Sequence, residues 1–400
     1  MNDRYQEQRP SAQTSPEDEQ AAIRVDRAQT ELMRGRAICL VDRVDESPAA
    51  AAVCHLVVVV CYLVVAVEML SAARLAWLSS WGEPLQLLLT AERASALGVP
   101  LLSLPGAAVC VSLPVGVSLE VLMEMAAVTP SLGRPVPAAS LSVVPQSSGQ
   151  QRAADSALAL AKGGRLMPAL LVVELPSAAA ERLRSAQLLS VSSTDVQLAP
   201  GRGERSLRRV SDAQVAIEAH EDCEVVLFRE DAGDAEHLAI IVGQPDFSQP
   251  VPLRLHSACL TGDLLGSLRC DCGDQLRRAI TRLAEHGGVL LYLQQEGRSI
   301  GLANKLRAYR IQDEGLDTID ADRYLGFMAD ERDYTPALAM LKSLGITRVR
   351  LLTNNPKKIA AIEAGGIEVV ERLALYSPVN PHNARYIETK QQRAGHLKED

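Results

Sequence analysis

Residues 274–314 read DQLRRAITRLAEHGGVLLYLQQEGRSIGLANKLRAYRIQDE, and this stretch decides the fold class. Leu276, Ile280 and Leu283 repeat at helical spacing on one face, and Gly287 ends that helix. Residues 289–293 form a short apolar run of the length of a buried strand, and a second helix is predicted over 302–314. A strand between two short helices is typical of an α/β domain.

The same alternation extends in both directions from this stretch. Towards the C-terminus we predict, in order, a helix with Thr335 as N-cap and Pro336 at N1 that ends at Gly345, a strand over 349–352, a helix begun by Asn355 and Pro356 that ends at Gly365, and a strand over 368–370. In the first half we predict a helix over 21–34 ended by Gly35, a strand over 38–41, and helices over 91–97 and 153–162.

We therefore predict an α/β (α+β) fold of two domains, each a mixed sheet with flanking helices. Residues 1–20 are polar and rich in Glu, Gln, Ser and Pro, which is typical of a disordered tail. The stretch QLAPGRGERSLRR (197–209) combines Pro, two Gly and a charge run, which favours a linker. The predicted boundaries are a tail over 1–20, a first domain over 21–196, a linker over 197–204 and a second domain over 205–400.

Composition restricts the possible functions. The net charge of −8 argues against a general nucleic-acid binder, although a few Arg or Lys residues can still form a local anion pocket. Residues 49–67 are nearly all apolar and long enough to suggest a membrane span. His55 inside this run, Glu68 after it and its many valines favour a buried strand, so we expect no membrane span. The polar start and the clustered cysteines favour a cytoplasmic protein.

Three clustered cysteines suggest a metal site. Cys259, Cys270 and Cys272 lie in RLHSACLTGDLLGSLRCDCGDQ (254–275), and thiolates suit Zn²⁺. In an extended segment, alternation would place Cys270 and Cys272 on one face. Three protein ligands plus a water are typical of a catalytic zinc, whereas a structural zinc has four. Two alternatives stay open: ordinary buried cysteines, or a structural site closed by His256.

Two further stretches suit a nucleotide. In QQEGRSIGL (294–302), Glu296 offers two acceptors for the adjacent N–H groups of a guanine, and Arg298 offers a fork for phosphate. TNNPKK (353–358) follows a strand and begins a helix, which is a natural anion site. Plain turn residues and an ordinary helix cap are the alternatives for either stretch alone. The P-loop pattern is absent from the sequence.

Taken together, these motifs resemble GTP cyclohydrolase II, the enzyme that starts riboflavin biosynthesis. The resemblance covers about 205–398 and includes HSACLTGDLLGSLRCDCGDQL, QQEGRSIGLANKLRAY, QDEGLDT, LGFMADERDY and RLLTNNPKK in one order. It implies a zinc-dependent hydrolysis of GTP, with Mg²⁺ on its triphosphate, to 2,5-diamino-6-ribosylamino-4(3H)-pyrimidinone 5′-phosphate, formate and pyrophosphate. It also implies a homodimer, and no nucleic-acid partner.

The resemblance assigns roles to individual residues. It implies zinc held by Cys259, Cys270 and Cys272, and GTP contacts from Arg254, Leu255, His256, Ser257, Ala258, Gln275, Glu296, Gly297, Arg298, Thr318, Thr353 and Lys358. In the family, the aspartate matching Asp330 is the proton acceptor, the arginine matching Arg332 is the nucleophile on the α-phosphorus, and the tyrosine matching Tyr309 lies near the base. A guanidinium stays protonated at neutral pH, so Arg332 is better suited to stabilising phosphoryl charge. Ala258 stands where many members have glutamate, so a side-chain contact is lost there.

The first half is similar to 3,4-dihydroxy-2-butanone 4-phosphate synthase, through ELMRGRAICLVDRVDE, YLVVAVEMLSAARLAWL and LLLTAERASALGVPL. Of the acidic cluster that the family uses for Mg²⁺, only Asp42, Asp45 and Glu46 remain, and His55 is the single histidine before residue 220. GQQRAADSALAL replaces the family's Gly-His-Thr-Glu segment. We therefore predict a catalytically inactive first domain. A bifunctional riboflavin enzyme and a structural zinc module stay open as alternatives.

Overall fold

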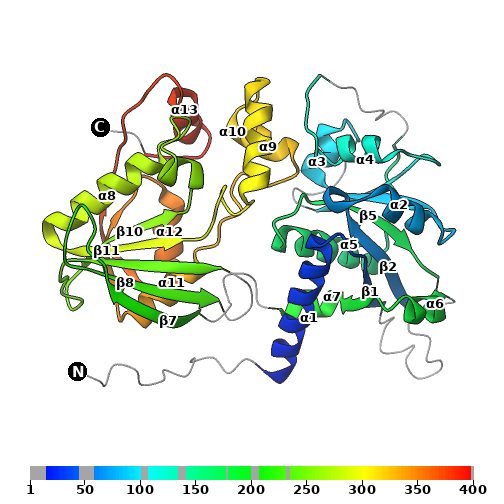
Figure 1. Cartoon of the computed structure of the whole chain (residues 1–400), viewed down its shortest axis with the longest axis horizontal. Helices are drawn as coiled ribbons and strands as arrows, with labels where there is room; N and C mark the ends of the chain where they lie inside the picture. Colours follow the sequence, from blue (N-terminus) through cyan, green and yellow to red (C-terminus); the bar gives the residue numbers. More distant parts are fainter. Residues whose placement is uncertain are drawn as a thin grey trace.

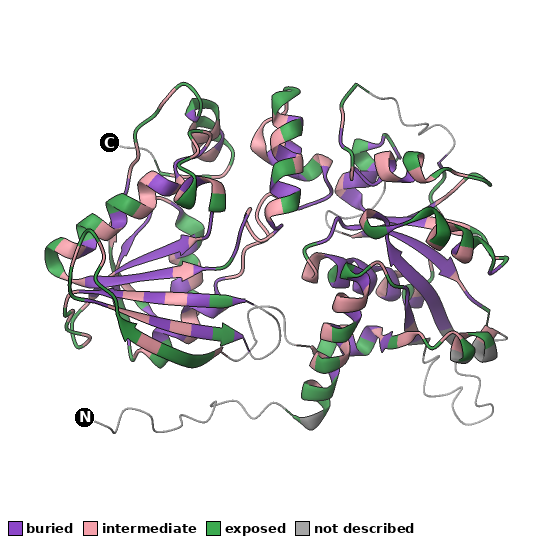
Figure 2. Ribbon diagram, in the orientation of Figure 1, coloured by how far each residue is buried: buried purple, intermediate pink, exposed green. Residues whose placement is uncertain are grey.

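The computed structural model describes residues 15–44, 58–100, 107–133, 141–176, 179–199, 207–230 and 235–397. The described residues form two mixed sheets, each flanked by helices, which confirms the predicted fold class (Figure 1). In both sheets the inner strands are the most buried elements, whereas the edge strands of the second sheet and the outer helices carry many exposed residues (Figure 2). No described helix has the length and apolar character needed to cross a membrane.

The first sheet is mainly antiparallel, and only its β1–β6 pair is parallel. Its strand order is β4 (Ala108–Ser112), β3 (Leu85–Thr90), β5 (Ala169–Glu174), β2 (Val58–Ala66), β1 (Ile38–Val44) and β6 (Leu189–Ser192). One face packs on α1 (Pro16–Met33), α5 (Ser148–Gly163) and α7 (Ser193–Leu198). The other face packs on α2 (Ala72–Ser79), α3 (Ala91–Ala96), α4 (Leu119–Met125) and α6 (Ala180–Ser185), and the short helix η1 (Val67–Met69) follows β2.

Strand β2 explains the apolar run of the sequence. Cys61, Leu63 and Val65 belong to the core on one face of the sheet. Tyr62 and Val64 belong to the core on the other face. A strand buried on both sides has no polar alternation, so its sequence is continuously apolar. The strand interpretation is therefore confirmed for 58–66, and residues 49–57 lie outside the described part.

Two helices of the first half begin earlier than predicted. α1 starts at Pro16 because Ser15 and Asp18 form a capping box, so residues 16–20 of the predicted tail are helical, and 1–14 lie outside the described residues. α5 starts at Ser148 for the same reason, with Ser147 and Gln150 as the box. α7 extends to Leu198, so the predicted linker begins inside a helix, and its part from residue 200 onward is not described.

The second sheet is parallel at one edge and antiparallel at the other. Its order is β13 (Glu368–Leu373), β12 (Arg348–Leu352), β10 (Val251–Ser257), β11 (Gly288–Leu293), β9 (Glu236–Val242), β8 (Cys223–Glu230) and β7 (Leu207–Gln214). The four strands from β13 to β11 run parallel. α11 (Thr335–Ser343) and α12 (Pro356–Ala364) cover one face, and α8 (Cys272–His286) covers the other.

The predicted start of α12 is confirmed, because the Asn355 side chain caps it by accepting from the Lys357 N–H. The predicted start of α11 is wrong by one residue. Tyr334 occupies its N-cap position, and Thr335 is the first helical residue. Asp333 takes over the capping role, because its carboxylate accepts from both the Thr335 N–H and hydroxyl.

Helices α9 (Leu302–Asp313) and α10 (Thr318–Tyr324) lie between the two sheets (Figure 1). A small shared core joins them to the first half, in which Met167 and Ala127 pack with Ile311, Leu325 and Phe327. The parallel strands β10, β11 and β12 end at the same edge of the second sheet, next to these helices. Ligands of open α/β sheets bind outside the carboxyl ends of such strands, so we expect a binding site at this edge.

One buried arginine joins the two halves. Arg93 is 1% exposed, and its guanidinium donates to the carbonyls of Glu124, Met125 and Tyr324. These carbonyls lie at the C-terminal ends of α4 and α10, where helices leave acceptors without intrahelical partners. The cation also suits the negative ends of both helix dipoles. Arg93 therefore fixes α10, a helix of the second half, to α4 of the first.

Candidate active site

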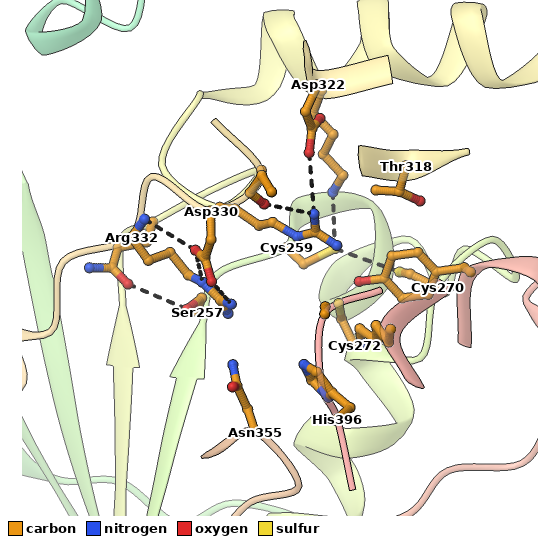
Figure 3. A pocket seen from close by; sticks show the side chains of 18 of the residues that line it. Ser257, Cys259, Cys270, Cys272, Thr318, Asp322, Asp330, Arg332, Asn355 and His396 are labelled. Carbon is orange, nitrogen blue, oxygen red and sulfur yellow. Dashed lines mark hydrogen bonds and ion pairs between the residues drawn. The ribbon is translucent and has the colours of Figure 1, made fainter. Parts of the chain in front are cut away.

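All the predicted site residues except Leu255 line one cavity at this edge of the second sheet. Figure 3 shows part of it, with the three cysteines near His396, and with Asp330, Arg332 and Ser257 gathered on another side. Leu255 is fully buried in β10, and only its backbone carbonyl is used, as the acceptor for Lys358 Nζ at 2.8 Å. The structure thus brings together residues from β10, the loops after β11 and β12, and helices α8, α9 and α10.

The three thiols form a compact cluster. The Sγ atoms of Cys259, Cys270 and Cys272 lie within 4.8 Å of one another, and Cys259 and Cys270 are 3.8 Å apart. The local backbone differs from the extended segment that we predicted. Cys272 is the first residue of α8, and a five-residue π-helix over Leu260–Leu264 brings the chain back from Cys259. The shared position of the thiols therefore comes from a helix start and a wide turn, and not from strand alternation.

The cluster fits zinc. Zn–S bonds of about 2.3 Å at tetrahedral angles place sulfur atoms about 3.8 Å apart, which agrees with the Cys259–Cys270 spacing. A Cβ on Gly262 would lie 2.9 Å from Cys270 Sγ and 3.1 Å from Cys259 Sγ, so only glycine leaves this cradle open. Among the described residues no fourth Cys, His, Asp or Glu joins the group.

His256 is engaged elsewhere. Its Nε2 lies 3.1 Å from both carboxylate oxygens of Asp263, and its ring stacks on Tyr292. Asp263 also accepts from the Cys259 N–H and from the Tyr292 hydroxyl. Burial lowers the pKa of His256, so its ring stays neutral. Among the described residues, the group of side chains close enough to share a metal does not include His256, so the alternative in which His256 closes a four-ligand structural site is wrong.

Lys305 of α9 is a site residue that the motif analysis missed. Its Nζ donates to Cys259 Sγ at 3.0 Å, to Thr261 Oγ1 at 2.9 Å and to Glu296 Oε1 at 2.8 Å. Although burial opposes it, the bonds to Cys259 and Glu296 raise the pKa of Lys305, so it remains a cation. Hydrogen bonds from the neighbouring thiols and from Lys305 hold the pKa of Cys259 far below its usual value. A thiolate at this position is the form that binds metal.

The turn after β11 holds the predicted base-binding residues. Glu296 is buried, and its Oε2 accepts the Leu260 N–H at 2.6 Å. Gly297, Arg298 and Ser299 all have positive φ, so the turn is tight. The Arg298 guanidinium donates to Asp322 Oδ2 at 3.2 Å and to the Ala329 carbonyl at 3.1 Å. Burial raises the pKa of Asp322 to about 7, and neither sequence motif nor spacing had marked this residue.

Tyr309 and Thr318 complete this side of the cavity. Burial raises the pKa of Tyr309, whose ring lies 4.5 Å from the Arg269 guanidinium and 5.7 Å from Lys305 Nζ. Thr318 is the first residue of α10, directly after the N-cap Asp317. Tyr309 thus lies near Lys305, which itself donates to Cys259 of the thiol cluster. Thr318 lines the cavity from α10, the helix that packs on the first half.

Several cationic side chains line the opposite side of the cavity. Lys358 is 5% exposed and Arg254 is also 5% exposed, yet neither forms an ion pair with a carboxylate of the described part of the chain. Burial and the nearby charges of Arg254, Arg332 and Lys390 lower the pKa of Lys358 well below its usual value. Arg254 Nε has no hydrogen-bond partner among the described residues. Buried charges are normally paired, so this group of cations is built for an anionic ligand.

Asp330 and Arg332 form a bidentate ion pair within one turn. Arg332 donates through Nε and Nη2 to the two oxygens of Asp330, at 2.7 and 2.6 Å. Although burial opposes it, this pairing raises the pKa of Arg332 further above its usual value. Against the same burial, Arg332 lowers the pKa of Asp330. The pair therefore presents a fixed cation and an ionised carboxylate to the cavity.

The C-terminal helix α13 (Ala384–Gln392) also reaches the cavity, and the motif analysis did not include it among the site residues. Tyr386, Lys390 and His396 line the pocket, and Lys390 Nζ donates to Asp271 Oδ1 at 2.6 Å. Lys390 lies 119 residues from Asp271, so no local pattern could have marked the pair.

Comparisons with known proteins identify the family. A family model described as GTP cyclohydrolase II matches residues 208–374. The GTP cyclohydrolase-2 of Escherichia coli O9:H4 is 50% identical over 192 residues, which cover 48% of this chain and 97% of that protein. The chain belongs to the GTP cyclohydrolase II family. This confirms that the second half resembles GTP cyclohydrolase II, as predicted from the sequence.

Some members of the GTP cyclohydrolase II family are longer than the Escherichia coli protein. The GTP cyclohydrolase-2 of Azospirillum brasilense is 52% identical over 246 residues, which cover 60% of this chain and 64% of that protein. For the corresponding protein of Xylella fastidiosa 9a5c the values are 46% over 232 residues, 58% of this chain and 58% of that protein. The chain therefore spans about three fifths of the length of these two relatives.

Among solved structures, the chain is similar to a two-domain 3,4-dihydroxy-2-butanone 4-phosphate synthase from A. baumannii. The TM-score is 0.32 at 17% identity, covering 89% of this chain and 99% of that chain. The structure adds an observation of its own about the first half. Arg152 pairs with the buried Asp42 at 2.8 Å, and Gln150 donates to both oxygens of Glu174 at 2.9 Å. Asp45, Glu46 and His55 lie outside the described residues.

Proposed function

We propose that this chain hydrolyses GTP to 2,5-diamino-6-ribosylamino-4(3H)-pyrimidinone 5′-phosphate, formate and pyrophosphate, the first step of riboflavin biosynthesis. The observation that carries the proposal is a cluster of three thiols beside a cavity with buried cations, where the described residues supply neither a fourth metal ligand nor a carboxylate paired with Arg254 or Lys358. GTP fits both features, because it brings a triphosphate for the cations and a ring carbon to be hydrolysed. Family membership supports the same reaction.

Cys259, Cys270 and Cys272 would hold the zinc. When bound, zinc supplies a Lewis acid that lowers the pKa of a water towards about 7, which ring hydrolysis at neutral pH requires. Lys305 keeps Cys259 in its thiolate form by donating to Sγ at 3.0 Å. Gly262 leaves the space that the three sulfur atoms need. Mg²⁺ would enter with the substrate, on the triphosphate of GTP.

Arg254 and Lys358 would bind the triphosphate, since both are buried and neither pairs with a carboxylate in the regions that the structure describes. Arg332 would stabilise the charge on the α-phosphate as pyrophosphate leaves. It is a poor nucleophile here, because its pairing with Asp330 keeps it protonated. Asp330 is held ionised by the same pair, so it can accept a proton.

Glu296 would select guanine. Its two oxygens already accept from Leu260, Gly297 and Lys305, which fixes the carboxylate plane and leaves one lone pair, on Oε2, for the base. The backbone of Ser257, Ala258 and Gly297 and the side chains of Gln275, Arg298, Thr318 and Thr353 would complete the site. Tyr309 would lie by the base and favour the ring-opened product.

The test is direct. Purified zinc-loaded protein should release formate and pyrophosphate from GTP with Mg²⁺, and the pyrimidinone should be seen by mass spectrometry. A protein that binds zinc but releases no formate would favour the structural zinc module instead.

We further propose that the first half makes no 3,4-dihydroxy-2-butanone 4-phosphate. The Arg152–Asp42 ion pair neutralises one of the few acids left at the predicted Mg²⁺ site. Incubation with ribulose 5-phosphate and Mg²⁺ should yield no butanone phosphate, and its formation would show a bifunctional enzyme. The homodimer implied by the resemblance stays a prediction, which multi-angle light scattering measures.

A further inference from the structure

A line of polar contacts joins the C-terminal helix to strand β10. Lys390 Nζ donates to Asp271 Oδ1, Gln275 Nε2 donates to Asp271 Oδ2, and Arg254 Nη2 donates to Gln275 Oε1, each at 2.6 Å. Asp271 and Arg254 are 6% and 5% exposed. The line begins outside residues 208–374, the stretch that matches the family model, and ends on a cation of the proposed triphosphate site.

The charge of Lys390 decides what the rest of the line can do. Asp271 is a buried carboxylate, and such a group is costly unless a cation pairs with it. With Lys390 in place, Asp271 is neutralised and still orients the Gln275 amide, so that its oxygen faces Arg254. Without Lys390, the negative charge of Asp271 would be left for Arg254 to neutralise, and Arg254 would be less available to an anion.

The residues that directly follow α13 bond to two sides of the cavity. Arg393 forms ion pairs with Asp317 and Asp320 at the start of α10. The Leu397 N–H donates to the Asn354 carbonyl at 2.9 Å, in the loop after β12. Figure 3 shows His396, from the same stretch of chain, near Cys272. The position of Lys390 is therefore set independently of its bond to Asp271.

We propose that Lys390 is a positioning residue for nucleotide binding: by neutralising Asp271 it holds Gln275 and Arg254 in the arrangement that receives the triphosphate. The inference rests on the proposed function for the identity of the ligand. It assigns a role to a residue of α13, a helix that contains none of the predicted site residues.

The experiment compares Lys390→Met with Lys390→Arg in the full-length zinc-loaded protein. Lys390→Met should raise the KM for GTP, and the Kd for a β,γ-methylene GTP analogue, by roughly 10- to 100-fold, the size of a lost charged hydrogen bond. Its kcat and its zinc content should change little. Lys390→Arg should recover most of the affinity, because it keeps the cation.

Two further variants separate positioning from simple folding. Arg385→Met removes a contact of the same helix, the bond from Arg385 to the Gly315 carbonyl, and should leave affinity unchanged. Adding Asp271→Asn to Lys390→Met removes the unpaired carboxylate, so the double variant should bind no worse than Lys390→Met alone.

An unchanged Kd in Lys390→Met, an equal loss in Arg385→Met, or loss of zinc from Lys390→Met would each overturn the inference. Wild-type protein that binds the analogue in a Lys390-dependent way but releases no formate would overturn only the proposed function. Wild-type protein that fails to bind the analogue would overturn both.

Discussion

At the scale of single residues, the cavity contains buried positive charges that lower the stability of the empty protein. Lys358 is buried and donates only to the Leu255 carbonyl, while Arg254 and Arg332 repel it. A buried cation without a carboxylate destabilises the empty protein, and an anionic ligand that binds it recovers that free energy. A substitution that removes the charge of Lys358 should therefore raise the stability of the empty protein and lower its affinity for the ligand.

Lys358→Met should test this opposition. The variant should raise the melting temperature of the ligand-free protein by a few degrees, about what 1 kcal/mol gives in a domain of this size. It should also lose most of the additional stabilisation that GTP gives the wild type. Melting curves with and without GTP measure both effects, with Lys342→Met, an exposed lysine of α11, as control. A lower melting temperature without ligand would contradict the argument.

Asp322 gives a pH dependence. Its folded-state pKa of about 7 lies above the ordinary value of about 3.9, so the folded protein holds this proton more tightly than the unfolded chain. The contribution of this group to stability is thus full below pH about 4 and is lost as pH rises through 7. Melting temperatures of wild type should fall relative to Asp322→Asn between pH 5 and pH 8. A difference independent of pH would refute this.

At the scale of elements, the metal site depends on how two turns meet. The π-helix Leu260–Leu264 and the first turn of α8 bring Gly262 against Cys270 and Cys272. Gly262 has no positive φ, so its requirement is steric only. The sequence could predict which thiols bind metal from their type and spacing. It could not predict how they converge, because we expected an extended segment at a position where α8 begins.

Gly262→Ala should therefore lower zinc content without unfolding the second sheet. The added Cβ would lie 2.9 Å from Cys270 Sγ and 3.0 Å from Cys272 Cβ. Zinc per chain, measured by mass spectrometry of metals, should fall well below one, and far-UV circular dichroism should stay unchanged. Gly133→Ala is the matched control, since a Cβ there meets nothing within 4 Å. Full zinc occupancy in Gly262→Ala would show that the cradle is wider than described.

Most of the site was predictable because its residues follow strands of the parallel edge. Glu296 and Thr353 come after β11 and β12, and the alternation of helices and strands places these strand ends together. Lys305, Asp322 and Lys390 were not predictable in the same way. Their partners depend on how helices pack, and the contact from Lys390 to Asp271 spans 119 residues.

At the scale of the whole molecule, the first half supports one wall of the cavity. α10 carries Thr318 and Asp322, and it packs on α3 of the first half. Arg93 and the Thr90 hydroxyl bond to the Tyr324 and Gly326 carbonyls. This contact gives the first half a structural role, because its removal would leave α10 without its neighbour.

Arg93→Met should weaken this contact. Three carbonyls, one buried and two partly buried, would lose a charged donor, so the free energy of unfolding should fall by on the order of 3 kcal/mol. The KM for GTP should rise as well, because α10 carries cavity residues. Denaturant unfolding and steady-state kinetics measure these, with the exposed Arg27→Met as control. Unchanged stability and KM would show that the halves are independent.

The proposed reaction requires a metal on Cys259, Cys270 and Cys272 for opening the guanine ring of a bound GTP. Formate release from GTP tests it most directly, in protein stripped of zinc by chelation and then reloaded. We expect no formate from the stripped protein, and one formate for each GTP consumed after zinc is restored. Undiminished formate release from protein shown to contain no metal would contradict the account.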